Sequence, residues 1–175
     1  MSAPFRHLVR VDAIPQEGRT VVLEANAAER EALASLYELP SVEALRASLE
    51  LSHAPQGSVS VRGAVHGVVT RICVISLEPF QAAVDEAIDV CFAPPRPEDE
   101  EEGVDEPQTF TMADEDEPDP IVDGGIDLGA LAAEFLALGL DPYPKKPGAM
   151  FEFRSDEGGT ASPFAALAEL ERKRD

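Results

Sequence analysis

Apolar and polar residues alternate over much of the first 95 residues, which is the pattern of half-buried strands. Residues 42–53 show it most clearly, because apolar side chains occupy every second position from 45 to 51 and polar side chains lie between them. Residues 80–92 alternate in the same way, apart from Glu86 on the apolar face. Both segments are predicted to be strands with one buried face.

Three further segments are predicted strands. Residues 5–14 and 19–25 alternate on either side of a Pro-Gln-Glu-Gly turn signal, so we expect them to pair as a hairpin. Residues 58–77 are rich in Val and Ile. We expect them to form one long bent strand or two short ones, with Gly63 and Gly67 at bulges or bends.

Helical signals occur in three places. Asn26 and Glu29 have the spacing of a capping box, and the helix that they begin should end at Pro40. A second helix is predicted over 127–139, with an Asp cap at its start and Gly at its end. Its apolar face would be Leu128, Leu131, Phe135 and Leu138. A last helix is expected to begin at residues 162–163, where Pro follows a Ser cap.

Together these elements predict an α+β fold with an antiparallel sheet, open or partly closed into a barrel, and about three helices. We expect a strand domain with one helix over residues 1–95 and an acidic, Pro-rich, disordered linker over 96–121. A C-terminal helical segment over 122–175 should pack on the first domain. A short strand at 150–153 is also expected.

The net charge of −20 is concentrated in one region. Residues 98–119 contain twelve acidic residues and no basic one, whereas the rest of the chain has 22 acidic and 14 basic residues. A block of like charges repels itself and stays solvated. The balance also argues against non-specific binding of DNA or RNA, which needs Lys and Arg, and favours basic partners where charge is used for recognition. Solubility alone is the other explanation.

The sequence contains no recognisable catalytic or cofactor motif. It has no Gly-rich phosphate loop and no nucleophile elbow, so the chain is predicted not to be an enzyme and to need no cofactor. The three histidines with Cys73 could hold zinc, but they lack the paired spacing of metal ligands, and we expect no metal site. The run 114–117 lacks the Gly and Glu of a calcium loop.

Cys73 and Cys91 are too few for a disulfide framework and are expected to be reduced and buried. A hairpin turning at Glu78-Pro79 would place residue 84 opposite Cys73, so we do not expect the two thiols to pair. The N-terminal residues lack the apolar run of a signal peptide, and no stretch approaches a membrane span of ~20 apolar residues. A cytoplasmic location without membrane contact is the expectation.

The segment after the second predicted helix, Asp-Pro-Tyr-Pro-Lys-Lys-Pro-Gly at 141–148, has no evident role in a core. Its prolines hold the backbone extended, so Lys145 and Lys146 could contact phosphate or an acidic surface. Salt bridges to nearby acids and to the helix C-terminus would explain them equally well. Our candidate partner-binding residues are Tyr143, Pro144, Lys145 and Lys146.

Several of these segments together resemble the YceD family of bacteria and plastids. The resemblance rests on Cys-Val-Ile-Ser-Leu-Glu-Pro-Phe at 73–80, Phe-Ala-Pro at 92–94, the acidic linker, residues 126–148, and Pro-Phe-Ala-Ala-Leu at 163–167. Residues 126–148 are its most specific part. Motif residues with an expected structural role are Cys73, Glu78, Pro79, Phe80, Asp127, Leu128, Glu134 and Pro142.

The resemblance implies a role in accumulation or processing of large-subunit (23S) ribosomal RNA, hence in ribosome biogenesis. Members of the family often have Cys-x-x-Cys where this chain has Cys73 and Ser76, so a metal or redox role for that pair is not carried over. The family supplies no agreed catalytic residues.

We therefore expect a non-catalytic factor that binds a basic ribosomal or rRNA-processing protein, or pre-rRNA within an assembly complex. A general protein-interaction module unrelated to ribosomes is the alternative, followed by an rRNA-processing enzyme. An enzyme would need clustered carboxylates on a rigid scaffold, and the only dense cluster lies in the predicted linker.

Overall fold

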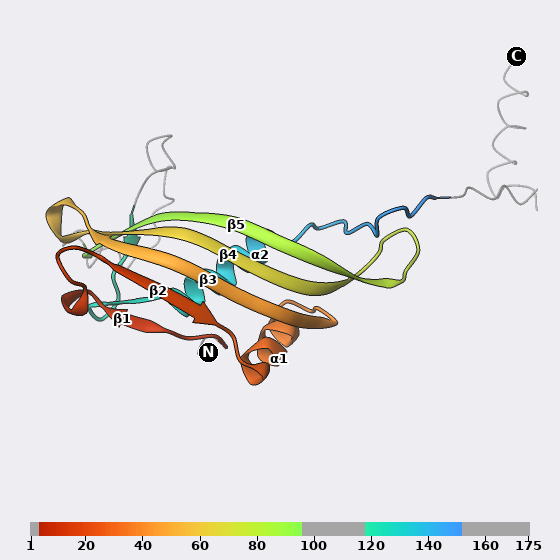
Figure 1. Ribbon diagram of the computed structural model, residues 1–175, viewed down its shortest axis with the longest axis horizontal. Coiled ribbons are helices and arrows are strands. Elements are labelled where there is room, and N and C mark those ends of the chain that lie inside the picture. Colours follow the sequence, from red (N-terminus) through yellow and green to blue (C-terminus); the bar gives the residue numbers. More distant parts are fainter. Residues whose placement is uncertain (1–3, 96–117, 152–175) are drawn as a thin grey trace, which may run out of the picture.

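The computed structural model describes residues 4–95 and 118–151 (Figure 1). This part of the chain has the predicted α+β fold, and it contains two of the three predicted α-helices. The elements in chain order are β1 (Leu8–Arg10), the 3-10 turn η1 (Val11–Ala13), β2 (Arg19–Glu24), α1 (Ala27–Leu36), β3 (Ser41–His53), the 3-10 turn η2 (Pro55–Gly57), β4 (Val59–Ile72), β5 (Pro79–Ala93), β6 (Asp119–Pro120), β7 (Gly125–Asp127) and α2 (Leu128–Leu138).

Five strands form one sheet in the order β2-β3-β4-β5-β6. The long strands pair antiparallel, and β6 joins the far side of β5 as a two-residue parallel strand. The first and last strands in this order do not pair with each other, so the sheet is open and the barrel alternative is wrong. The core lies on one face of this sheet, beneath a second layer made by α2 and the pair β1–β7 (Figure 1).

The predicted hairpin of residues 5–14 with 19–25 is wrong. β1 instead pairs with β7, more than 110 residues further along the chain, and β2 pairs with β3. Backbone bonds on both sides of β1 fix this pairing, since the Leu128 N–H donates to the His7 carbonyl and the Val11 N–H donates to the Gly124 carbonyl. The 3-10 turn after β1 then separates it from β2, so the turn signal at 15–18 connects two sheets rather than two paired strands.

The capping box at the start of α1 is confirmed. The Asn26 side chain accepts the Glu29 N–H at 3.0 Å, and the Glu29 carboxylate accepts the Asn26 N–H at 2.7 Å. The alternation of β3 is confirmed as well. The alternating apolar side chains Leu45, Ala47, Leu49 and Leu51 are each no more than 1% exposed, and Val42 near the start of β3 is buried too.

The glycines of β4 are not at bulges, because the pairing of β4 with both neighbours runs through Gly63 and Gly67 without a shift. They are needed for close approach. A Cβ on Gly63 would lie 2.0 Å from the Ser48 carbonyl oxygen, and a Cβ on Gly67 would lie 2.4 Å from Cδ1 of Leu136. Gly67 therefore leaves the space into which α2 inserts Leu136, which is fully buried.

The caps predicted for α2 are confirmed, but its buried face is only partly as predicted. Leu128 and Leu131 are buried and Phe135 is half-buried, whereas Leu138 is 69% exposed. Leu136 takes the place expected for Leu138, because α2 faces β4 with the side on which Gly67 leaves room.

Other predictions fall at the limits of the described residues. Met150 and Phe151 are exposed and lie outside any strand, and the rest of the predicted strand at 150–153 is outside the described residues. The last predicted helix and most of the acidic linker are also outside them. At the linker's end, residues 119–120 form β6 and Ile121 is buried.

Candidate functional site

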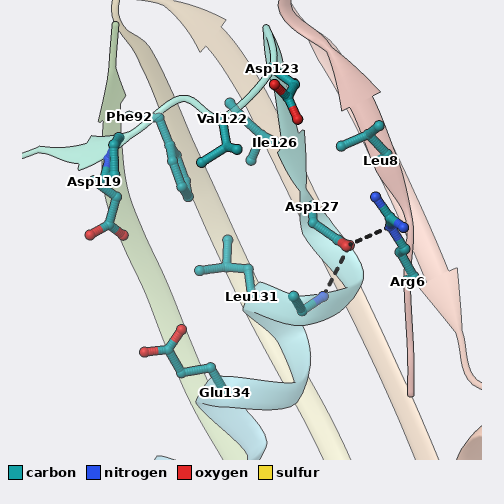
Figure 2. Close-up of a pocket in the computed structure, with 13 residues that line it drawn as sticks. Arg6, Leu8, Phe92, Asp119, Val122, Asp123, Ile126, Asp127, Leu131 and Glu134 are labelled. Atoms are coloured by element: carbon teal, nitrogen blue, oxygen red, sulfur yellow. Dashed lines mark hydrogen bonds and ion pairs between the residues drawn. The ribbon is translucent and has the colours of Figure 1, made fainter. Parts of the chain in front are cut away.

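A pocket of the described chain lies where α2, β1, β7 and the end of β5 meet (Figure 2). It has a volume of about 350 Å³. Residues from both ends of the fold line it, with Arg6 and Leu8 from the N-terminal side and Leu131 and Glu134 from α2. The long-range pairing of β1 with β7 and of β6 with β5 creates this pocket.

The pocket has an apolar interior. Phe92 is half-buried, Ile126 and Leu131 are buried, and the exposed side chains of Leu8 and Val122 continue the apolar surface outward. In Figure 2 these side chains lie between the carboxylates rather than mixed with them. A ligand with apolar atoms at its centre would fit this interior.

Carboxylates surround that interior on several sides. Asp119 and Glu134 lie on the β5 side of the pocket, Asp123 lies at the opposite end from Glu134, and Asp127 lies on the β1 side (Figure 2). Arg6 is the one cation among the lining residues. We call this site the acidic pocket, and its chemistry suits a ligand that combines apolar groups with positive charge.

The Asp127 carboxylate is engaged in contacts within the protein, so its role is to stabilise the pocket rather than to bind a ligand. Its Oδ1 accepts the His7 N–H at 2.8 Å and the N–H groups of Gly129 and Ala130 at 3.1 and 3.2 Å. It thereby caps α2 and ties β1 to the helix start. Its Oδ2 lies 3.4 Å from Nε of Arg6, so the one cation among the described lining residues is already paired. Asp119, Asp123 and Glu134 form no ion pair with the described cations.

The tail (residues 141–148) docks on the hairpin turn between β4 and β5 (residues 73–78). The Val74 N–H donates to the Pro144 carbonyl at 2.9 Å, and Arg71 donates to the Asp141 carbonyl at 2.6 Å. Pro144 is buried by these contacts. The tail therefore has the structural role that the sequence alone did not indicate.

Cys73 is at the centre of this contact. Its buried sulfur accepts the N–H groups of Ile75 and Ser76 at 3.4 Å and that of Lys146 at 3.3 Å. Hydrogen bonds from Ser76, through its side chain and its backbone, and from Lys146 lower the pKa of Cys73 to about 6. The sulfur thus joins the turn to the tail.

The two lysines of the tail differ. Nζ of Lys146 lies 2.8 Å from the Glu78 carboxylate, and this hydrogen bond raises the pKa of Lys146 and lowers that of Glu78. Lys145 and Tyr143 are exposed. That Tyr143, Pro144, Lys145 and Lys146 contact a partner stays a prediction, and only Tyr143 and Lys145 are freely accessible for it.

The remaining motif residues fall into two groups. Asp127 and Glu134 line the acidic pocket, and Leu128 is fully buried beneath it. At the other end of the sheet, Pro79 and Phe80 begin β5 beside the tail, while Pro142 is exposed. Sequence reasoning missed Asp119, Asp123, Leu8 and Phe92 as site residues, because only the long-range strand pairing brings them together.

The register predicted at Cys73 is wrong. The turn spans 73–78, with Leu77 at a φ of +57°, so Glu78 rather than Val84 lies opposite Cys73, and Val84 pairs with Gly67. Cys91 lies opposite Ser60 and is exposed, not buried as expected, and both thiols are free.

In the described part of the chain, no three His, Cys, Asp or Glu side chains gather as metal ligands would. Instead, Nδ1 of His66 lies 2.6 Å from an Asp85 carboxylate oxygen, and Nε2 of His53 lies 3.0 Å from the Ile14 carbonyl. Among the same residues, no helix is long and apolar enough to cross a membrane.

Comparison with known proteins gives one result. No curated protein and no solved structure matches the chain. The family model described as large ribosomal RNA subunit accumulation protein YceD matches residues 61–171, which include most of β4, all of β5, the α2 side of the acidic pocket and the tail. The chain therefore belongs to the YceD family.

Proposed function

We propose that this protein supports accumulation of large-subunit ribosomal RNA as a non-catalytic factor that binds a basic ribosomal or rRNA-processing protein. Membership of the YceD family implies the role in rRNA accumulation, and that family is not known as one of enzymes. The observation that carries the choice of partner is the acidic pocket, where Asp119, Asp123 and Glu134 surround an apolar interior without a paired cation among the described residues.

A protein partner fits this pocket better than RNA does. Phosphate groups would meet three carboxylates, and the net charge of −20 adds long-range repulsion. Ribosomal proteins that bind rRNA need Lys and Arg, and such side chains carry apolar stems that suit the Phe92–Leu131 interior. The effect on rRNA would then follow from holding or delivering that protein.

The test is affinity capture of the tagged full-length protein from cells, with and without RNase, followed by quantification of ribosomal proteins and pre-rRNA. A triple variant Asp119→Lys, Asp123→Lys, Glu134→Lys should lose the captured ribosomal proteins. The matched control Glu17→Lys, Glu31→Lys, Glu50→Lys changes the net charge equally at exposed positions outside the pocket and should keep them. Equal capture by both variants would contradict the proposal, and loss of all capture after RNase would favour direct contact with pre-rRNA.

A further inference from the structure

Over residues 85–91, no other strand of the described residues 4–95 and 118–151 pairs with the outer edge of β5. β4 occupies one side of β5, and β6 occupies the other side only at Phe92 and Ala93. The Ala93 carbonyl points outward, since it accepts the Ile121 N–H at 2.8 Å. Backbone groups of alternate residues point to the same side of a strand, so those of Asp85, Ala87, Asp89 and Cys91 also point outward. No described strand pairs with them.

This edge carries charged side chains, including Glu86 on the face towards α2, but it lacks the Pro, Gly and bulges that also protect edge strands. Residues 85–91 contain no Pro and no Gly, and their pairing with β4 is regular. The carboxylates of Asp85 and Asp89 are engaged across the sheet, with His66 at 2.6 Å and Arg62 at 3.0 Å. β6 shows that the edge accepts a strand where one is offered. The tail lies beside β5 only further back, near Phe80 and Val84.

Carboxylates on the face of β5 that carries α2 should make this edge favour a positively charged segment. A side chain on Gly139 would collide with the Glu86 carboxylate, so that carboxylate lies against the C-terminal end of α2, where a negative charge is unfavourable. Glu134 and Asp119 lie on the same side of the acidic pocket (Figure 2). A strand added here would place every second side chain near these three carboxylates.

We propose that a basic, extended segment of the partner protein binds by adding a strand to β5 at residues 85–91, with Lys or Arg at alternate positions facing Glu86, Glu134 and Asp119. This inference rests on the proposed function and specifies how its partner binds. Main-chain hydrogen bonds give such binding its affinity, and the alternating cations give it selectivity. The pocket's apolar interior then receives the end of the segment nearest Phe92.

The direct test is amide hydrogen exchange by NMR on the full-length protein, with a synthetic octapeptide of alternating lysine and valine. The amides of Asp85, Ala87, Asp89 and Cys91 should exchange at least about tenfold more slowly with the peptide, because they gain hydrogen-bond acceptors. The amides of Glu86 and Val90 already bond to β4 and should not change. A peptide with glutamate in place of lysine should have no effect. Unchanged exchange at the four outward amides, or full protection of them in the free protein, would overturn the proposal.

Two changes separate strand addition from simple charge attraction. Ala87→Pro removes one outward N–H while leaving the β4 pairing, and Ala87→Thr keeps that N–H as the matched control. The proline variant should bind the peptide at least about tenfold more weakly than the threonine variant. N-methylation of alternate peptide residues blocks pairing without altering the protein and should have the same effect.

The outcomes also distinguish this inference from the proposed function. If Ala87→Pro and peptide methylation leave binding intact while the triple pocket variant loses ribosomal proteins, strand addition is wrong and the proposed function stands. If the triple pocket variant keeps them, the proposed function falls, and with it the partner assigned to this edge.

Discussion

The contact between Gly67 and Leu136 should decide whether α2 stays docked, and a double-mutant cycle measures it. Leu136→Ala removes a fully buried side chain and should cost about 2–5 kcal/mol of the free energy of unfolding. Gly67→Ala places a Cβ 2.4 Å from Cδ1 of Leu136, so it should cost about 1–3 kcal/mol through overpacking. The next atom, the Ala44 carbonyl oxygen, is 3.6 Å from that Cβ, which is ordinary contact.

In the double variant the new Cβ enters the space left by Leu136. We therefore expect the two substitutions together to cost about 1–2 kcal/mol less than the sum of the single costs. Urea unfolding of the full-length protein, followed by circular dichroism, gives each value. Leu138→Ala on the exposed side of α2 is the control and should stay within about 0.5 kcal/mol of the parent chain. Costs that add to within about 0.5 kcal/mol would refute the interpretation of Gly67 as the space for Leu136.

Three further predictions concern the elements that hold the site. Asp127→Ala removes the cap of α2 and the acceptor for the His7 N–H, so thermal unfolding should show that the free energy of unfolding falls by about 1–2 kcal/mol. Asp127→Asn keeps an acceptor oxygen and should lose less stability. Equal losses in the two variants would contradict the capping role. The pKa of Cys73 falls from its usual 9.0 to about 6 on folding, so between these pH values the unfolded chain holds a proton that the folded chain has released. The loss of stability caused by Cys73→Ala should therefore grow as the pH rises from about 6 towards 9. A loss that does not depend on pH would argue against a thiolate at Cys73. Lys145→Glu with Tyr143→Ala should reduce captured ribosomal components if the tail contacts a partner, without lowering the melting temperature, whereas unchanged capture would remove the tail from the binding surface.

The sequence predicts the local elements of this fold well, because their signals are local. The capping box at Asn26 and Glu29 and the alternation of β3 depend on residues within one element, and both are present in the structure. The caps of α2 are local in the same way. Each of these elements could be assigned without knowing what lies against it.

Contacts between segments far apart in the chain could not be predicted from the sequence. A turn signal at 15–18 looks the same whether it joins paired strands or different sheets, so the pairing of β1 with β7 was not predictable from it. A glycine such as Gly67 gives the same sequence signal whether it forms a bulge or allows another element to approach closely, and only the position of Leu136 distinguishes the two. The acidic pocket needs both β1–β7 and β5–β6 to exist, and it is therefore the part of the protein least visible in the sequence.

The segment 118–151 runs beneath the sheet from one end to the other. It pairs with the end of β5 through β6, fills the space at Gly67 through α2, and reaches the turn at Cys73 through its last residues. The rest of the fold is contained in residues 4–95, and the two parts are joined covalently only through 96–117. A chain cut within that connection should consequently remain one particle, held by the β5–β6 and β1–β7 pairings between its two fragments. Two separately expressed fragments should reconstitute it, and the four strands β2, β3, β4 and β5 would stay together in the first of them.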